Sequence, residues 1–228
     1  PDVYFQVLRD CGALAVVFPE LDALFGVPQP EQWHPEIDAG VHTLMVLRQA
    51  ALLSAAVTVR FAALTHDLGK GRTPRERWPM HHGHESAGVV LIDALCDRLR
   101  VPNEHRELAR LVARYHCDAH RAFELRATTV LAMLERCDAF RRPGRFEELL
   151  LACEADARGR LGFEARPYPQ AAYLRLCLAA ARSVELEPVV REGLDGAAIG
   201  LRLHELRAQA VAAVKARAGV AGPAAQIR

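Results

Sequence analysis

Apolar residues recur at helical spacing along almost the whole chain, and this pattern constrains the fold more than any other feature. Val41 is followed by apolar residues three and four positions further on, Leu44 and Met45, and Leu44 is followed by Leu47. Alternating runs of β-branched residues are nearly absent. The sequence therefore predicts an all-α fold, a helical bundle followed by a helical tail.

Prolines and glycines divide this helical pattern into segments. The prolines between residues 28 and 35 predict a loop before a helix that starts near Glu36, because proline lacks a backbone donor and disfavours helix in the residue before it. The run Gly69–Pro74 predicts the end of the next helix and a polar loop that continues to Gly83. Further helices are predicted at about 84–99, 103–117, 127–140, 145–160, 168–187 and 194–218.

The composition excludes several classes of protein. A net charge of +1 argues against binding to nucleic acid or membrane through the overall charge of the protein. No apolar stretch reaches the roughly 20 residues of a membrane span. Six cysteines without a C-x-x-C pair predict reduced thiols in the cytoplasm. No secretory signal is visible, and the start at Pro1 rather than Met leads us to expect a fragment.

The adjacent pair His66-Asp67 is the clearest chemical signal. With His42 upstream and Asp138 downstream, it supplies two imidazoles and two carboxylates, the ligands that Mn, Ni, Zn or Mg accept. Neighbouring side chains on a helix diverge by roughly 100°, so both members of the pair can face one ion only near a helix end. Gly69 supplies that end, and the four residues predict a hydrolytic metal site in which bound water becomes the nucleophile.

These residues also carry a family resemblance. The sequence resembles the HD-domain metal-dependent phosphohydrolases at His42, 63–70, 83–85, 115–116 and 137–139. It is similar, over about residues 1–217, to the C-terminal half of the bacterial multifunctional CCA-adding tRNA nucleotidyltransferases, at 33–38, 135–143 and 154–160. In that family a nucleotidyltransferase head with a Gly-Ser loop and an Asp-x-Asp pair precedes this region, and neither motif is present here.

The resemblance implies an activity, a cofactor and a set of partners. It implies phosphatase, 2′-nucleotidase and 2′,3′-cyclic phosphodiesterase activity with nickel, magnesium or manganese, on nucleotides or on tRNA 3′ ends, and no nucleotide addition. It also implies an N-terminal helical segment at 1–35, an HD domain at 36–165, a helical body and tail at 166–218 and a disordered tail at 219–228. We further expect no membrane partner and allow for a homo-oligomer.

Site residues follow from the same motifs. His42, His66, Asp67 and Asp138 match the metal-ligand pattern, and His66, Asp67, His84 and His116 are the predicted catalytic residues. His84 and His116 match positions of further ligands for a second metal or of groups facing phosphate, and they are predicted to assist the leaving oxygen. Asp156 is the second choice for the distal carboxylate, with an ordering role for Arg158 or Arg160 as the alternative.

Basic residues are the candidates for substrate binding. Lys70 either neutralises a phosphate oxygen or only complements the helix dipole. Arg136, Arg141 and Arg142, with a second group at 158–166, either contact tRNA phosphates or form a solvated helix face.

Three further residues have both a functional and a structural interpretation. His81 and His82 lie in the loop beside His84 and either reach the substrate or are solvated. Asp195 is predicted to cap the last helix, in a segment that resembles part of the family's tail.

Two rival functions remain open from the sequence. One is a non-catalytic module that holds tRNA, with a structural or vestigial His and Asp cluster. The other is a general nucleotide phosphohydrolase unrelated to tRNA.

Overall fold

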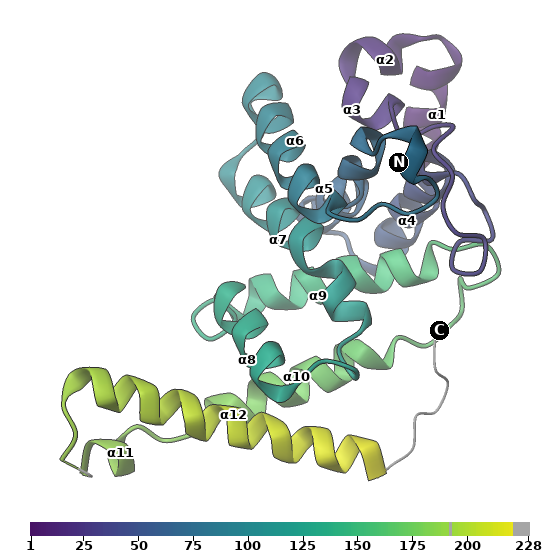
Figure 1. Cartoon of the computed structure of the whole chain (residues 1–228). Helices are drawn as coiled ribbons and strands as arrows, with labels where there is room; N and C mark the ends of the chain where they lie inside the picture. Colours follow the sequence, from purple (N-terminus) through teal and green to yellow (C-terminus); the bar gives the residue numbers. More distant parts are fainter. Residues whose placement is uncertain (192, 221–228) are drawn as a thin grey trace. The chain divides into compact units, whose positions relative to one another are not determined.

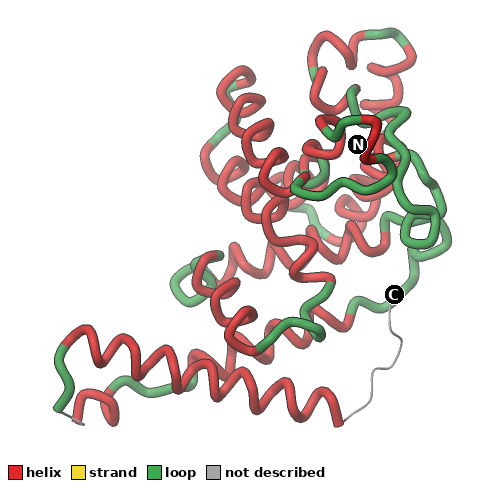
Figure 2. Tube along the Cα trace, in the orientation of Figure 1, coloured by secondary structure: helices red, strands yellow, loops and turns green. Residues whose placement is uncertain are grey.

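All regular secondary structure is helical in residues 1–191 and 193–220, the part of the chain that the computed structural model describes. The ribbon and the tube show helices joined by loops (Figure 1, Figure 2). An antiparallel bridge joins Pro28 to Asp38. The predicted all-α fold is confirmed. None of the helices in this described portion is long and apolar enough to cross a membrane.

The chain divides into two compact units that are each built from separate stretches of sequence. Unit 1 contains Pro1–Cys117 and Glu147–Tyr168, and unit 2 contains Asp118–Phe146 and Pro169–Arg228. The domain boundaries expected from the sequence, 1–35, 36–165 and 166–218, stay a prediction. Most of the predicted disordered tail, 221–228, lies outside the described residues.

Unit 1 holds most of the helices and all of the candidate metal ligands except Asp138. Its elements are α1 Asp2–Asp10, α2 Ala13–Val17, α3 Pro19–Asp22, α4 Ala39–Leu53, α5 Val57–Thr65, the 3-10 helices η1 Leu68–Arg72 and η2 Arg75–Arg77, α6 His84–Leu99, most of α7 Asn103–His120 and most of α9 Pro143–Arg158. Fully buried leucines and an isoleucine form its core, among them Leu14, Leu24, Leu68, Ile92 and Leu108. Helix α4 packs against α5, and η1 packs against α6.

Helix α4 begins later than predicted. Its first residue is Ala39, because the Asp38 side chain caps it by accepting a hydrogen bond from the Val41 backbone N–H at 2.9 Å. Ile37 has a φ of 60°, which no helix interior adopts. Glu36 therefore lies in the turn before the helix, and this placement directs its carboxylate toward His42.

The chain after His66 is less open than the predicted polar loop. Helix α5 ends at Thr65, and Asp67 precedes the 3-10 helix η1, so the pair does lie at a helix end. Leu68, Gly69 and Lys70 are buried. A Cβ on Gly69 would meet the His84 carbonyl oxygen at 2.0 Å, so only glycine allows η1 to lie this close to α6.

Unit 2 consists mainly of α8 Ala127–Arg136, α10 Pro169–Arg182, α11 Glu187–Arg191 and α12 Gly196–Val220. Helix α8 ends four residues before the predicted end, since Asp138 has a φ of 55°. Helix α10 also ends early, at Arg182. The Asp195 carboxylate accepts a hydrogen bond from the Ala198 N–H at 2.9 Å, which confirms the predicted cap of the last helix.

Candidate metal centre

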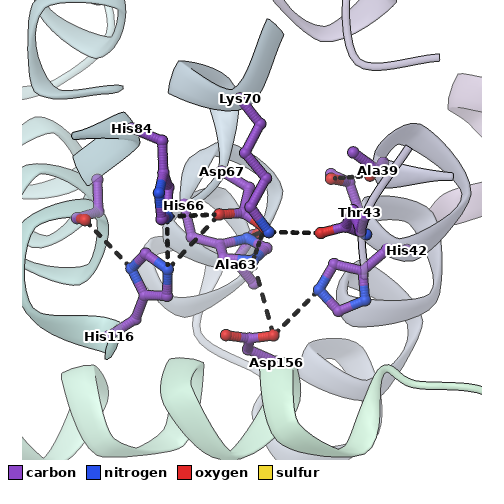
Figure 3. Close-up of polar contacts among 12 residues, drawn as sticks. Ala39, His42, Thr43, Ala63, His66, Asp67, Lys70, His84, His116 and Asp156 are labelled. Carbon is purple, nitrogen blue, oxygen red and sulfur yellow. Dashed lines mark hydrogen bonds and ion pairs between the residues drawn. The ribbon is translucent and has the colours of Figure 1, made fainter. Parts of the chain in front are cut away.

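Four histidines from four helical elements of unit 1 turn their rings toward one space (Figure 3). His42 comes from α4, His66 follows α5, His84 opens α6 and His116 lies in α7. The ring centroids of His42 and His66 are 5.6 Å apart, those of His66 and His116 5.3 Å, and those of His84 and His116 5.4 Å. The structure thus brings together residues separated by up to 74 positions in the chain.

In each of these rings, Nδ1 faces an oxygen atom that can accept a hydrogen bond. Because a carbonyl oxygen can only accept, Nδ1 must be the donor in the bonds from His66 to Ala63 O at 2.7 Å, from His84 to His81 O at 2.7 Å and from His116 to Val112 O at 3.0 Å. In His42, Nδ1 lies 2.8 Å from the Glu36 carboxylate. The Nε2 atoms are therefore the ring nitrogens that face the shared space, and each can bind a metal ion once it carries no proton.

Asp67 lies between one of these nitrogens, on its Oδ2 side, and two others, on its Oδ1 side. Its Oδ2 is 3.1 Å from His66 Nε2, and its Oδ1 is 3.3 Å from His84 Nε2 and 3.5 Å from His116 Nε2. The side chain is 1% exposed, so these contacts are screened little by solvent. Two oxygens that face different nitrogens make Asp67 suited to bridge two ligand groups.

Asp156, near the end of α9, is the carboxylate that completes the group. Its Oδ1 lies 3.0 Å from His42 Nε2 and 3.7 Å from His66 Nε2, and the side chain is buried. Asp156 was only the second choice for the distal carboxylate in the sequence analysis.

Asp138, the first choice, belongs to unit 2 and has other partners. Its carboxylate accepts hydrogen bonds from Arg141 at 2.7 and 3.0 Å and lies within 3.8 Å of Arg142 and Arg145. The hydrogen bond from Arg141 lowers the pKa of Asp138. The structure thus accounts for Asp138 by local ion pairing and places Asp156 beside His42.

The charges of the group oppose what burial alone would produce. Burial raises the pKa of Asp67, but His66 and Lys70 outweigh it and hold this pKa well below its usual value. Burial lowers the pKa of His84, whereas hydrogen bonds to Asp67 and Cys117 raise it to about 9. Burial raises the pKa of Cys117, but His116 and His84 outweigh burial and lower this pKa to about 7. At neutral pH the group thus retains protons that a divalent cation would displace.

Lys70 is part of this group and not a solvated helix-end lysine. Its Nζ lies 2.5 Å from Asp67 Oδ2 and donates a hydrogen bond to Gln29 Oε1, and its side chain is 9% exposed. The other predicted substrate-binding residues, Arg136, Arg141 and Arg142, are exposed on unit 2. Their contact with substrate stays a prediction.

The two loop histidines differ in their surroundings. His81 is buried, and its Nε2 donates to the Pro28 carbonyl oxygen at 2.9 Å. His82 is exposed. His81 therefore ties the loop to the segment before α4, and His82 offers a control position beside the site.

Sequence reasoning missed the residues that support the group. Glu36 accepts from His34 Nδ1 at 2.9 Å while it lies beside His42, and its other oxygen accepts from the Leu161 N–H at 3.2 Å. Cys117 Sγ lies 3.4 Å from His116 Nε2. The spacing of His34, Glu36 and His42 in one short stretch was the available signal, but their contact depends on the turn at Ile37.

The donors present fit a divalent metal ion. His66 Nε2 and Asp67 Oδ1 are buried and make no hydrogen bond of normal geometry within the described part of the chain. One atom each of His42, His66 and Asp67 lie within 4.8 Å of one another, and the same holds for His84, His116 and Cys117. Imidazole nitrogen with carboxylate oxygen suits Mn, Ni, Zn and related ions.

Comparison with known proteins agrees with this geometry. A family model described as the HD domain matches residues 40–158, just over half of the chain, and this range contains His42, His66, Asp67, His84, His116 and Asp156. A protein described as "Multifunctional CCA protein" from Thioalkalivibrio sulfidiphilus (strain HL-EbGR7) is 63% identical over 219 residues, which cover 96% of this chain and 54% of the relative. The chain thus spans about half the length of that relative.

Proposed function

This chain belongs to the HD domain family, and on that premise we propose that it is a metal-dependent phosphohydrolase. We assign the metal position to His42, His66, Asp67 and Asp156. The observation that carries the proposal is the convergence of four Nε2 atoms whose rings are each held at Nδ1 by a carbonyl or carboxylate oxygen. Such a second partner on each ring is the usual mark of a metal-ligating histidine.

A divalent cation in this position would lower the pKa of a water molecule and offset negative charge on a phosphoryl oxygen. The protein's own contribution is to hold the donors without rearrangement. Glu36 fixes the orientation of the His42 ring, and the backbone carbonyls of Ala63 and Val112 do the same for His66 and His116. Preorganised donors of this kind need no reorganisation during the reaction.

We propose that Lys70 neutralises the charge of Asp67 before a metal ion binds and contacts the substrate afterwards. Its ammonium lies on the Oδ2 side of Asp67, where a cation held by His66 would also bind, so the two compete for that oxygen. Once displaced from Asp67, the Lys70 ammonium, which sits on a flexible four-carbon stem, can donate a hydrogen bond to a phosphoryl oxygen. His84 and His116, at the Oδ1 side, are the proposed pair beside the leaving oxygen.

The proposed substrates are phosphate esters at nucleotide 2′ and 3′ oxygens, including 2′,3′-cyclic phosphates and tRNA 3′ ends. The support is the motif resemblance over 33–38, 135–143 and 154–160 together with the 63% identity to a relative whose name refers to CCA. Exposed arginines on unit 2 offer the planar forks that bind RNA phosphates.

The test is hydrolysis of 2′,3′-cyclic AMP by chelator-stripped protein after Ni, Mn, Mg or Zn is added back singly. We expect turnover to return with at least one ion and to fall by at least about 10²-fold in Asp67→Asn, which keeps the side-chain shape but removes the charge. His82→Ala, an exposed histidine of the adjacent loop, is the matched control and should keep wild-type turnover.

The outcomes separate the rival functions. Metal-restored turnover with measurable tRNA affinity supports the proposal, whereas turnover on mononucleotides without tRNA affinity indicates a general nucleotide phosphohydrolase. Absence of turnover with every ion, combined with tRNA binding, would replace the proposal by a tRNA-holding module.

A further inference from the structure

One arginine of unit 1, close to the metal centre, has no partner for its charge. Arg160 lies two residues beyond the end of α9 and four residues after Asp156, and it is half-buried. Its Nε is buried without a hydrogen bond, and its guanidinium makes no hydrogen bond or ion pair with any residue that the structure describes. A buried donor without an acceptor is unfavourable. The Arg160 side chain is thus available to bind an anion.

The neighbouring arginines in the sequence are engaged with the chain itself. The Arg158 guanidinium lies 2.8 Å from the Glu154 carboxylate and donates a hydrogen bond to the Arg166 carbonyl oxygen at 3.1 Å. The Arg166 guanidinium packs over the Phe163 ring, 4.7 Å from its centre. Of the basic group at 158–166, the structure therefore singles out Arg160 as the candidate for a bound phosphate.

Backbone contacts on both sides of Arg160 fix its position beside α4. A Cβ on Gly159 would lie 2.6 Å from a Cα atom of α4, so this residue touches the helix that carries His42. On the other side, the Leu161 N–H donates to Glu36 at 3.2 Å, and the second oxygen of Glu36 lies 2.8 Å from His42 Nδ1. Arg160 is thereby held at the Nδ1 edge of the His42 ring.

The group that Arg160 faces on this side carries no charge at neutral pH. Burial lowers the pKa of His34 to about 3, and the positive charge of Arg160 contributes to this lowering. His34 packs edge-on against His42 with ring centroids 4.6 Å apart, and its Nδ1 lies 2.9 Å from Glu36. A neutral imidazole does not repel Arg160 and does not compensate its charge, so the positive charge stays available to an anion.

The His42 ring separates this position from the metal position. Its Nδ1 faces Glu36 at one edge, whereas its Nε2 faces Asp156 at the opposite edge, as Figure 3 shows for Asp156. A phosphate bound by Arg160 is therefore not the phosphate at the metal ion. In an RNA strand each nucleotide adds one phosphate, so the group next to a phosphate on the terminal 2′ or 3′ oxygen is the one on the 5′ oxygen of the same nucleotide.

We propose that Arg160 binds the 5′-phosphate of the nucleotide whose 2′ or 3′ phosphate lies at the metal position. The planar guanidinium can donate two parallel hydrogen bonds to one phosphate. This inference rests on the proposed function and narrows its substrate class. Nucleotides with a second phosphate, such as the ends of RNA strands, are preferred over nucleosides with a single phosphate.

The test compares hydrolysis of 2′,3′-cyclic AMP with and without a 5′-phosphate by the metal-loaded full chain. Arg160→Gln should raise KM for the 5′-phosphorylated compound by about 10–100-fold, the size expected for hydrogen bonds to a charged group. The KM for 2′,3′-cyclic AMP, which lacks this phosphate, should change little. Arg160→Lys should recover only part of the loss, because an ammonium cannot make the two-pronged contact. Arg166→Gln, a half-buried arginine of the same stretch, is the matched control and should keep both KM values.

A binding measurement separates this inference from the proposed function. In calorimetry with the chelator-stripped protein, we expect adenosine 3′,5′-bisphosphate to bind the wild-type chain more tightly than 3′-AMP, and this difference to vanish in Arg160→Gln. If the difference is present but no metal ion restores turnover, the proposed hydrolysis fails and the phosphate contact stands. Equal binding of the two ligands by the wild-type chain would refute the contact. An equal loss for both ligands in Arg160→Gln would also refute it, since Arg160 would then act on the phosphate at the metal position.

Discussion

Gly69 is the residue at which a single added methyl group should disturb both the fold and the site. A Cβ there would lie 2.0 Å from the His84 carbonyl oxygen, 2.7 Å from the Gly88 nitrogen and 2.8 Å from the His84 carbonyl carbon. These are backbone atoms, so no side chain can rotate away. Normal carbon-to-oxygen contacts are about 3.3–3.6 Å, which means that η1 and the first turn of α6 must separate by roughly 1.3 Å.

The energetic and catalytic consequences of Gly69→Ala follow from this shift. Overpacking in a well-packed interior costs about 1–3 kcal/mol, and rigid backbone neighbours place Gly69 at the upper end. For a chain of this length that corresponds to a fall in Tm of roughly 6–12 °C. The same shift separates Asp67 Oδ1 from His84 Nε2, now 3.3 Å apart, and a displacement of about 1 Å costs roughly 10²-fold in rate.

The assay compares three glycine variants by thermal melting and by metal-dependent hydrolysis. Gly71→Ala, whose added Cβ would lie 3.1 Å from the Ala23 carbonyl oxygen, should be mildly destabilised. Gly144→Ala, with no atom within 4 Å of the added Cβ, should melt at or slightly above the wild-type temperature. A Gly69→Ala protein that melts within about 2 °C of wild type and keeps its turnover would refute the reasoning.

Three further changes test the centre. Lys70→Met should tighten metal binding by about tenfold or more, since unit charges 4 Å apart repel by ~4 kcal/mol at an effective dielectric constant of 20, while it lowers turnover; calorimetry that shows weaker binding would contradict this. Asp156→Asn should lower metal affinity and turnover by about 10²-fold, whereas Asp138→Asn should change neither, and the reverse pattern would restore the first assignment from sequence. For Glu36→Gln, the stabilities of wild type and variant should converge as the pH falls. Hydrogen bonds from histidine lower the pKa of Glu36 in the folded state against the effect of burial, so its contribution is present above the unfolded value of 4.5 and lost below it. A stability gap that stays constant in urea melts from pH 6 to roughly pH 3 would contradict that sign.

The sequence predicted the helices well where the apolar pattern was long and a breaking residue marked the end. The bounds predicted for the helix at 84–99 agree with α6, because Gly83 precedes its start. Errors occurred where a single backbone conformation decides the end. Ile37 and Asp138 adopt positive φ values that their residue types seldom take, so neither the start of α4 nor the end of α8 was visible in the pattern.

The grouping of His42, His66, Asp67, His84 and His116 was accessible from the motifs, and the structure brings all five together in unit 1. Their order around Asp67 was not accessible. Which nitrogen faces Oδ1 and which faces Oδ2 depends on how η1 packs against α6, and that contact is set by the absence of a side chain at Gly69. The position of Cys117 Sγ is equally a consequence of tertiary packing.

The neighbouring residues in the sequence already distinguish Asp138 from Asp156 as candidate metal ligands. Asp138 is followed by arginines at three, four and seven positions further on, so local ion pairing was available to it without any metal. Asp156 is followed by Gly159, where an added Cβ would lie 2.6 Å from the Val46 Cα of α4, four residues beyond His42. That close approach places Asp156 beside His42, and alanines at 155 and 157 keep the same stretch small. Small residues around a carboxylate let its helix approach the helix that carries the histidine. Because proximity to the other donors decides ligation, such a carboxylate is a better candidate ligand than one set among arginines.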